Sequence, residues 1–143
     1  RQIAAVCDEP KVYDNVFGAL FKGKRYSIEN ARTFTRLVTE GWEKGSRFDW
    51  LILHEGAIVG TIGIKSLEGE IGYWQSVHHP GVMTDATKAV CAMARDAGFA
   101  ALWAYVKRTN LASVKVLEGA GFTLDMELTS KRDDAKGYRI RLQ

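Results

Sequence analysis

The sequence is poor in the features that interrupt or cross-link a chain. Its 143 residues include only two prolines and two cysteines, and its fourteen glycines are scattered. Like charges form no run, so the composition indicates neither a linker nor a disordered tail. With 46% hydrophobic residues, a chain of this length buries about two thirds of its unfolded surface. We therefore predict one domain over residues 1–143.

Other features that the sequence lacks indicate the cellular compartment and the kinds of partner to expect. No apolar run reaches the length of a membrane span, and no signal-peptide pattern is present. Cys7 and Cys91 lie far apart and form no CxxC pair, which indicates a reducing compartment. The 20 basic and 17 acidic residues alternate rather than forming a basic stripe. We expect a cytoplasmic protein whose partner is neither a membrane nor a nucleic acid.

Helical periodicity dominates the first third of the chain. Apolar residues recur at helical spacing in two sets, which are Val12, Val16 and Leu20, then Ile28, Ala31, Phe34, Leu37, Val38 and Trp42. Ser27 directly precedes the second set and has the side chain of an N-cap. The pattern predicts helices before the first strand.

Short strands and helices alternate in the rest of the chain. Strands are predicted at 50–53, 57–64, 70–74, 100–106, 123–129 and 138–142, with turns at 54–56 and 67–69 and helices at 82–97 and 111–120. Two strands joined by a helix lie parallel with a right-handed crossover, so 70–74 and 100–106 should be parallel. Ligands bind beyond the carboxyl ends of such strands, here at 75–84 and 107–113.

The loop before the helix at 82–97 contains a candidate anion site. Backbone N–H groups at the start of a helix converge on anions. The residues that would supply them are Gly81, Val82, Met83 and Thr84, and Thr84 adds a hydroxyl. Alternatively, Gly81 only permits a tight turn, and taken alone the pattern favours this alternative.

Neither metal chemistry nor a cysteine nucleophile is predicted. The adjacent side chains of His78 and His79 point in different directions, and no third ligand lies at a recognisable spacing. Cys91 lies within a predicted helix and has no histidine at a fixed nearby spacing.

Four segments, in register, resemble the GNAT superfamily of N-acetyltransferases. They are Gly69–Trp74, Pro80–Ala86, Asn110–Ser113 and Val116–Phe122. Their order and spacing are most similar to the branch that includes the ribosomal-protein alanine and serine N-acetyltransferases. The resemblance implies an α/β fold of one GNAT acyl-CoA N-acyltransferase domain, in which helices flank a central, splayed and mostly antiparallel mixed sheet.

The resemblance also implies acetyl-CoA as the acyl donor, bound in a gap between two parallel strands. It implies that the pyrophosphate lies on the Gly81 loop, formed by Gly81, Val82, Met83 and Thr84, and the pantetheine along Gln75, Ser76 and Val77. Asn110 matches an asparagine beside the CoA arm, although a plain helix N-cap is equally compatible. The family loop is usually Arg/Gln-x-x-Gly-x-Gly/Ala. Here Pro80 removes one N–H donor and Met83 replaces a small residue.

Acetyl transfer needs a base, because amines with a pKa of about 8 to 10.4 are protonated at neutral pH. The resemblance places a glutamate of this kind at Glu70; alternatively, Glu70 is an exposed strand-end carboxylate. Backbone N–H groups of 75–77 are candidate donors to the tetrahedral oxyanion. Ser113 is similar to a serine that assists the departing thiolate, or it only satisfies backbone groups at the third helical position. Many members have a tyrosine where this chain has Leu117.

These residues predict an N-acetyltransferase that acts by direct attack of a primary amine on acetyl-CoA. The acceptor is a protein N-terminus or a small-molecule amine, and the sequence does not choose between them. The alternative is a catalytically weak CoA-binding or sensing module, which the altered loop and Leu117 permit. The first strand usual in the fold is expected to be missing or to precede Arg1, which leaves a sheet edge open to a partner chain. A homodimer is therefore left open.

Overall fold

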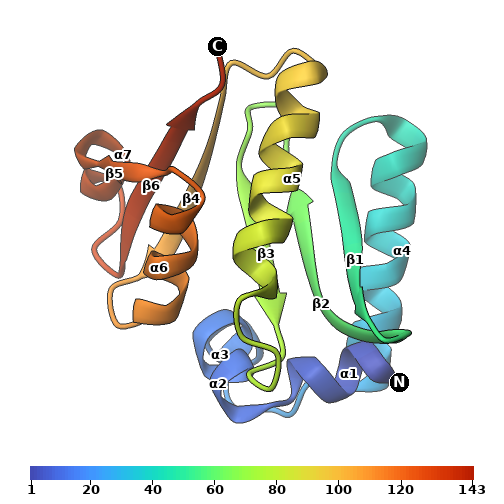
Figure 1. The fold of residues 1–143 in the computed structure, drawn as a ribbon. Coiled ribbons are helices and arrows are strands. Elements are labelled where there is room, and N and C mark those ends of the chain that lie inside the picture. The colour runs from blue at the N-terminus through green and yellow to red at the C-terminus, as the bar shows by residue number, and fades with distance from the viewer. The chain divides into compact units, whose positions relative to one another are not determined.

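The computed structural model describes residues 1–143 (Figure 1). Its helices are α1 (Gln2–Cys7), α2 (Pro10–Val12), the π-helix η1 (Tyr13–Phe17), α3 (Gly18–Phe21), α4 (Ile28–Lys44), α5 (Val82–Asp96), α6 (Leu111–Gly119) and α7 (Met126–Ser130). Its strands are β1 (Phe48–His54), β2 (Ala57–Ile64), β3 (Ile71–Gln75), β4 (Ala101–Lys107), β5 (Thr123–Asp125) and β6 (Ala135–Arg141). The chain forms two compact units. We call Arg1–Gly63 with Tyr73–Pro80 the N-terminal unit, and Ile64–Gly72 with Gly81–Gln143 the C-terminal unit.

A tight hairpin begins the first sheet, whose strand order is β1-β2-β3. Glu55 and Gly56 connect β1 to β2, and both have positive φ angles, 48° and 81°. A two-residue turn with two positive φ angles matches the right-handed twist of the flanking strands. The hairpin predicted around residues 54–56 is confirmed, and β1 begins earlier than predicted, at Phe48.

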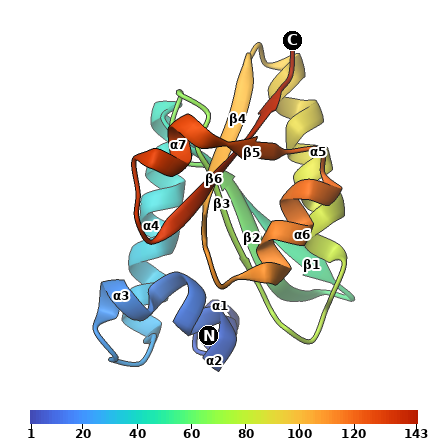
Figure 2. The ribbon, with the colours of Figure 1, turned by 90° about the vertical axis from the view of Figure 1, so that its left-hand side faces the viewer.

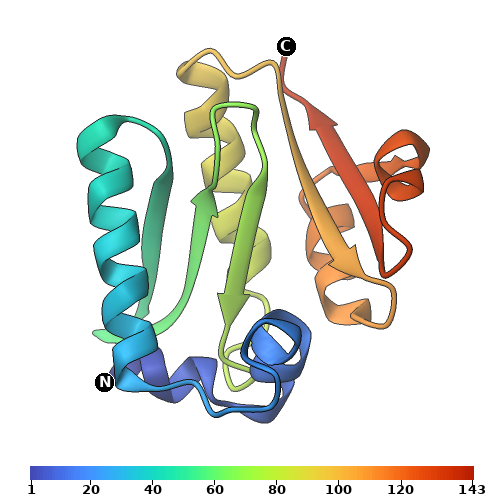
Figure 3. The ribbon, with the colours of Figure 1, turned by 180° about the vertical axis from the view of Figure 1, so that it is seen from behind.

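Helix α4 begins at a capping box and runs alongside β1 (Figure 3). The Ser27 hydroxyl accepts a hydrogen bond from Asn30 N at 3.1 Å, and Asn30 Oδ1 accepts one from Ser27 N at 2.8 Å. These bonds satisfy N–H groups that a helix start leaves unpaired, so the predicted N-cap is confirmed. Part of the apolar face predicted for this helix is exposed: Leu37 and Trp42 are both accessible, and Trp42 packs edge-on against Trp50.

The segment through Val12, Val16 and Leu20 is helical as predicted, but Val16 and Leu20 do not face the core. The chain forms α2, one π-helical turn and α3, so the residues that face the protein are shifted. Val16 is 42% exposed and Leu20 71% exposed. Phe17 and Phe21 face inward instead, with ring centroids 4.7 Å and 5.6 Å from the buried ring of Tyr26.

The second sheet lies in the C-terminal unit and has the antiparallel order β4-β6-β5. Its register pairs Trp103 with Arg139 and Leu124 with Tyr138. Burial alternates along β4, where Leu102, Ala104 and Val106 are buried and the residues between them are half-buried. One face of this sheet therefore belongs to the core and the other is partly open.

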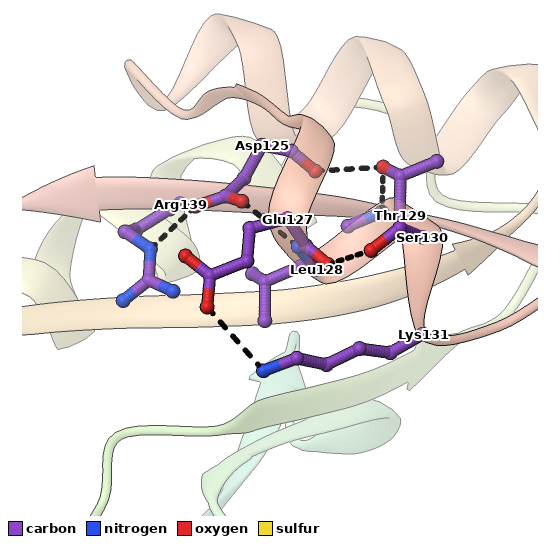
Figure 4. A network of polar contacts seen from close by, with 8 residues as sticks. Asp125, Glu127, Leu128, Thr129, Ser130, Lys131 and Arg139 are labelled. Atoms are coloured by element: carbon purple, nitrogen blue, oxygen red, sulfur yellow. Dashed lines mark hydrogen bonds and ion pairs between the residues drawn. The ribbon is translucent and has the colours of Figure 1, made fainter.

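The strand predicted at 123–129 is corrected to a short strand followed by helix α7 (Figure 2). Asp125 ends β5 and caps α7, accepting from Leu128 N at 2.9 Å with one carboxylate oxygen and from Arg139 Nε at 2.7 Å with the other (Figure 4). The Thr129 hydroxyl donates to Asp125 O and accepts from Gly137 N on β6. These bonds turn the chain out of the sheet after three residues.

The parallel arrangement predicted for the strands before and after α5 is confirmed at one residue pair. Glu70 and Trp103 form a parallel bridge, and Trp103 N donates to Gly69 O at 3.0 Å. Gly69 has a φ of 100° at this point, and a side chain there would collide with Ala101 O. None of the helices combines the length and the apolar character needed to cross a bilayer.

Candidate active site

In the N-terminal unit, the predicted cofactor residues Gln75, Ser76 and Val77 form the end of β3 and the residues just after it. Ser76 is only 4% exposed, and its backbone N–H donates to Val59 O at 2.7 Å. Gln75 Nε2 donates to His79 O at 3.4 Å. This segment is thus a fixed continuation of the sheet.

Glu9 contacts this segment and was not among the residues predicted from the sequence. Its carboxylate accepts from the Ser76 hydroxyl at 2.8 Å and from Val77 N at 3.0 Å. Partners 67 and 68 positions away leave no local pattern around Glu9, so the sequence carried no signal for these contacts.

These contacts bear on the predicted oxyanion donors. The N–H groups of Ser76 and Val77 already donate to Val59 and Glu9, respectively. Either group would have to leave its partner before it could donate to a tetrahedral oxyanion. Backbone contacts from 75–77 to pantetheine stay a prediction.

In the C-terminal unit, the start of α5 carries the predicted phosphate-binding residues Gly81, Val82, Met83 and Thr84. Gly81 is the N-cap with a left-handed φ of 89°, and as a glycine it has no side chain to cap the helix itself. A glycine before a helix lets the backbone approach an anion at the helix start, where N–H groups point outward along the axis. Met83 is fully buried, so its side chain points into the core. The turn and the anion-binding alternatives are both compatible with this geometry.

Glu70, the predicted base, directly precedes β3 and has a 28% exposed side chain. Its Oε1 lies 3.5 Å from Lys65 Nζ, and its backbone O accepts from Lys65 N at 2.6 Å. The Glu70 carboxylate also interacts electrostatically with Arg132. The pKa of Arg132 is raised chiefly by its hydrogen bond to Asp134, and Glu70 adds a smaller contribution. Glu70 is thus a partly accessible carboxylate in a basic setting.

The predicted CoA-arm residue Asn110 is the N-cap of α6. Its side chain accepts from Ser113 N at 3.2 Å, which confirms the capping alternative; one side chain can also contact a ligand. Ser113 therefore lies at the third helical position, half-buried, as predicted. Leu117, where many members have a tyrosine, is fully buried in the core.

The structure contains neither a group of side chains that could hold a metal ion nor an exposed thiol. No three residues among His, Cys, Asp and Glu are placed to hold a metal ion. Cys7 and Cys91 are both buried and unbridged. Burial raises the pKa of the Cys7 thiol to about 12, which keeps it protonated and unreactive at neutral pH.

The candidate residues thus form two sets. One set, in the N-terminal unit, comprises residues 75–77 and Glu9. The other, in the C-terminal unit, comprises Glu70, the start of α5 and the start of α6. Within that second set α5 and α6 pack together, with Thr84 next to Gly119.

Comparison with known families gives one match that covers most of the chain. The family model described as an acetyltransferase (GNAT) domain matches residues 1–123. That range contains every candidate residue of both sets. No curated protein matches the sequence.

Solved structures share the fold at low sequence identity. The microcin C7 self-immunity acetyltransferase MccE, in complex with acetyl-CoA and AMP, is 16% identical, with a TM-score of 0.81 over 98% of this chain and 85% of that one. RimL, a ribosomal L7/L12 α-N-protein acetyltransferase in complex with coenzyme A, is 17% identical, with the same TM-score and coverage. An acetyltransferase from Agrobacterium tumefaciens is 21% identical, with a TM-score of 0.75 over 98% of this chain and 83% of that one.

Proposed function

The chain belongs to the GNAT acetyltransferase domain family, and we propose that it transfers an acetyl group from acetyl-CoA to a primary amine. The observation that carries the proposal is the family match over residues 1–123, which includes the start of α5, Glu70 and Ser113. The solved structures of the same fold include complexes with acetyl-CoA and with coenzyme A.

The proposed donor-binding residues fit the chemistry of coenzyme A. Pyrophosphate is an anion, and α5 begins at a glycine N-cap, where the positive end of the helix dipole favours negative charge. The buried Met83 side chain leaves the outer surface of this helix start to the backbone and to Thr84. Asn110 is proposed to lie beside the CoA arm while it caps α6, and residues 75–77 to contact the pantetheine.

The proposed reaction forms a C–N bond and breaks a C–S bond. The neutral amine attacks the thioester carbonyl carbon, and the carbonyl oxygen takes up negative charge in the tetrahedral intermediate. Glu70 removes the amine proton, directly or through water. When the intermediate collapses, the thiolate leaves while the Ser113 hydroxyl donates a hydrogen bond to it. The thiolate then takes a proton from water, and Glu70 returns its proton to water.

A catalytically weak CoA-binding module is the second candidate function. Leu117 favours it, because a fully buried leucine supplies no hydroxyl where many members have a tyrosine. The engaged amides of Ser76 and Val77 favour it as well. Calorimetry with acetyl-CoA and an assay of thiol release with a panel of amines separate the candidates. Binding with thiol release supports the enzyme, and binding without release supports the module.

The acceptor is proposed to be the α-amine of a protein or a small-molecule amine. RimL is described as acting on a protein α-amine, and MccE was solved with AMP. A panel containing N-terminal peptides with serine or alanine in first place, lysine peptides and aminoacyl nucleotides distinguishes these classes by kcat/KM.

Replacing Glu70 by glutamine tests the catalytic assignment. We expect Glu70→Gln to lower kcat about a hundredfold, because the amide cannot take a proton at neutral pH. Acetyl-CoA affinity measured by calorimetry should stay near the wild-type value. The matched control is Glu68→Gln, which makes the same change at an exposed carboxylate two residues away. Wild-type turnover in Glu70→Gln would remove Glu70 from the mechanism.

A further inference from the structure

Glu9 links the N-terminal helices to the end of β3. It lies in the turn between α1 and α2, and its hydrogen bonds reach the two residues that follow β3. Its two carboxylate oxygens bind different groups: Oε1 accepts from the Ser76 hydroxyl and Oε2 from Val77 N. Hydrogen bonds to an ionised acceptor are stronger than neutral ones, and Ser76 is almost fully buried.

The turn that carries Glu9 is itself anchored. The neighbouring Asp8 accepts from Tyr26 N at 3.1 Å and from Arg25 Nε at 2.9 Å. Tyr26 in turn packs in the core of the N-terminal unit. These contacts fix the backbone of the turn and therefore the position of Glu9.

The Ser76 hydroxyl connects Glu9 to the backbone that follows β3. It donates to Glu9 and accepts from His78 N at 3.3 Å, while Ser76 N donates to Val59 O. Ser76 is thereby tied to β2 and to the turn between α1 and α2, Val77 is tied to that turn, and His78 is tied to Ser76. Little freedom remains for the backbone of 75–77.

We infer that Glu9 is a positioning residue that fixes the end of β3 for acetyl-CoA binding. The inference rests on the proposed function, in which residues 75–77 contact the pantetheine. Glu9 acts through Ser76 and Val77, and it exchanges no proton with a substrate. In this role the amides of Ser76 and Val77 stay on Val59 and Glu9, so the proposed pantetheine contact falls to the other backbone groups of 75–77, which are held in place without a further ordering cost.

Two substitutions separate this role from acid–base chemistry. In Glu9→Gln, the amide oxygen still accepts from Val77 N and the amide nitrogen donates to Ser76 Oγ once the hydroxyl rotates. Glu9→Ala removes both bonds. A positioning role predicts that glutamine restores function, whereas a role as a base predicts that glutamine and alanine are equally damaging.

Steady-state kinetics test the role. For Glu9→Ala we expect an increase of about tenfold in the KM for acetyl-CoA, a kcat within about threefold of wild type and an unchanged acceptor KM. Glu9→Gln should return the acetyl-CoA KM to within about threefold of wild type. Glu43→Ala, which removes an exposed carboxylate on α4, is the matched control and should behave as wild type. An unchanged acetyl-CoA KM in Glu9→Ala, or equal losses in the glutamine and alanine variants, overturns the proposal.

Amide hydrogen exchange tests the contact without reference to activity. In ligand-free protein, Glu9→Ala should speed exchange of the Val77 amide by about tenfold or more, and Glu43→Ala should not. Unchanged Val77 exchange in Glu9→Ala also overturns the proposal. A wild-type protein that binds no acetyl-CoA refutes the proposed function itself. Wild-type binding combined with an unaffected Glu9→Ala variant refutes only the positioning role.

Discussion

Ser113 combines a structural and a proposed chemical role in one residue. Its backbone N–H completes the cap of α6 by donating to Asn110, and its hydroxyl is the group proposed to assist the thiolate. Because a substitution to alanine keeps the backbone N–H, the cap survives the loss of the hydroxyl.

We therefore expect Ser113→Ala to lower kcat about tenfold and to leave the acetyl-CoA KM nearly unchanged. The effect is smaller than for Glu70, because a thiolate leaves readily without full protonation. Ser46→Ala removes a hydroxyl from an exposed loop and serves as the control. Equal kcat values for both variants would show that Ser113 only supports the helix.

At the same scale, the sequence predicted residues whose roles are local. Asn110 as a cap and Gly81 at a helix start follow from spacing over three or four positions, and both are found. Glu9 could not be predicted, because its partners are fixed only once β3 lies beside β2. Whether Glu70 acts as a base depends on a ligand that neither sequence nor fold contains.

Among the elements, the π-helical turn has the largest effect on the predicted pattern. One extra residue in the turn Tyr13–Phe17 rotates the following side chains, so Phe17 replaces Val16 on the inner face. Helical spacing assumes 3.6 residues per turn throughout and misses this change.

The strand predicted at 123–129 failed for a different reason. Leu124, Met126 and Leu128 alternate as in a strand, but the Asp125 cap starts a helix within the run.

A pair of alanine substitutions tests the register of this segment. Phe17→Ala should destabilise the protein by about 2 kcal/mol, because it removes a half-buried ring that packs on Tyr26 and Phe21. Val16→Ala removes an exposed side chain and should cost no more than about 0.5 kcal/mol. Urea unfolding followed by circular dichroism measures both values. The opposite order of the two values would restore the regular helix through Val12, Val16 and Leu20.

For the whole molecule, paired carboxylates set the response of stability to acid. The pKa is lowered in each of three carboxylates, chiefly by hydrogen bonds from Arg25 to Asp8, from Leu128 N and then Arg139 to Asp125, and from Arg132 to Asp134. A carboxylate whose folded pKa lies below its unfolded value of about 3.9 binds fewer protons when folded. Its contribution is present above about pH 4 and is lost as the pH falls through the folded pKa.

We accordingly expect the unfolding temperature to fall steeply below about pH 4. Asp8→Asn should lower it at pH 7 and flatten the acid limb, because one of these carboxylates is then absent. Asp96→Asn, an exposed site on α5, should leave the profile unchanged. Differential scanning fluorimetry from pH 2 to pH 7 measures the three profiles. Parallel curves for the wild type and Asp8→Asn would contradict the assignment.

At this scale the sequence predicted the fold class and the order of most elements, since strands, helices and tight turns follow from periodicity and glycine positions. The GNAT resemblance supplied the family, which the match over residues 1–123 confirms. The first helix α1 and the side-chain contacts that join distant segments were not predicted, because burial there depends on the assembled core.

The bond between Glu9 and Val77 also bears on the order in which the chain folds. Helix α4 and the β1–β2 hairpin rely on contacts close in sequence, which form within microseconds. Closing a loop of 68 residues requires those elements first, because its entropic cost must be met before the contact contributes. During synthesis, the turn between α1 and α2 therefore stays unanchored on its Glu9 side until Val77 has left the ribosome.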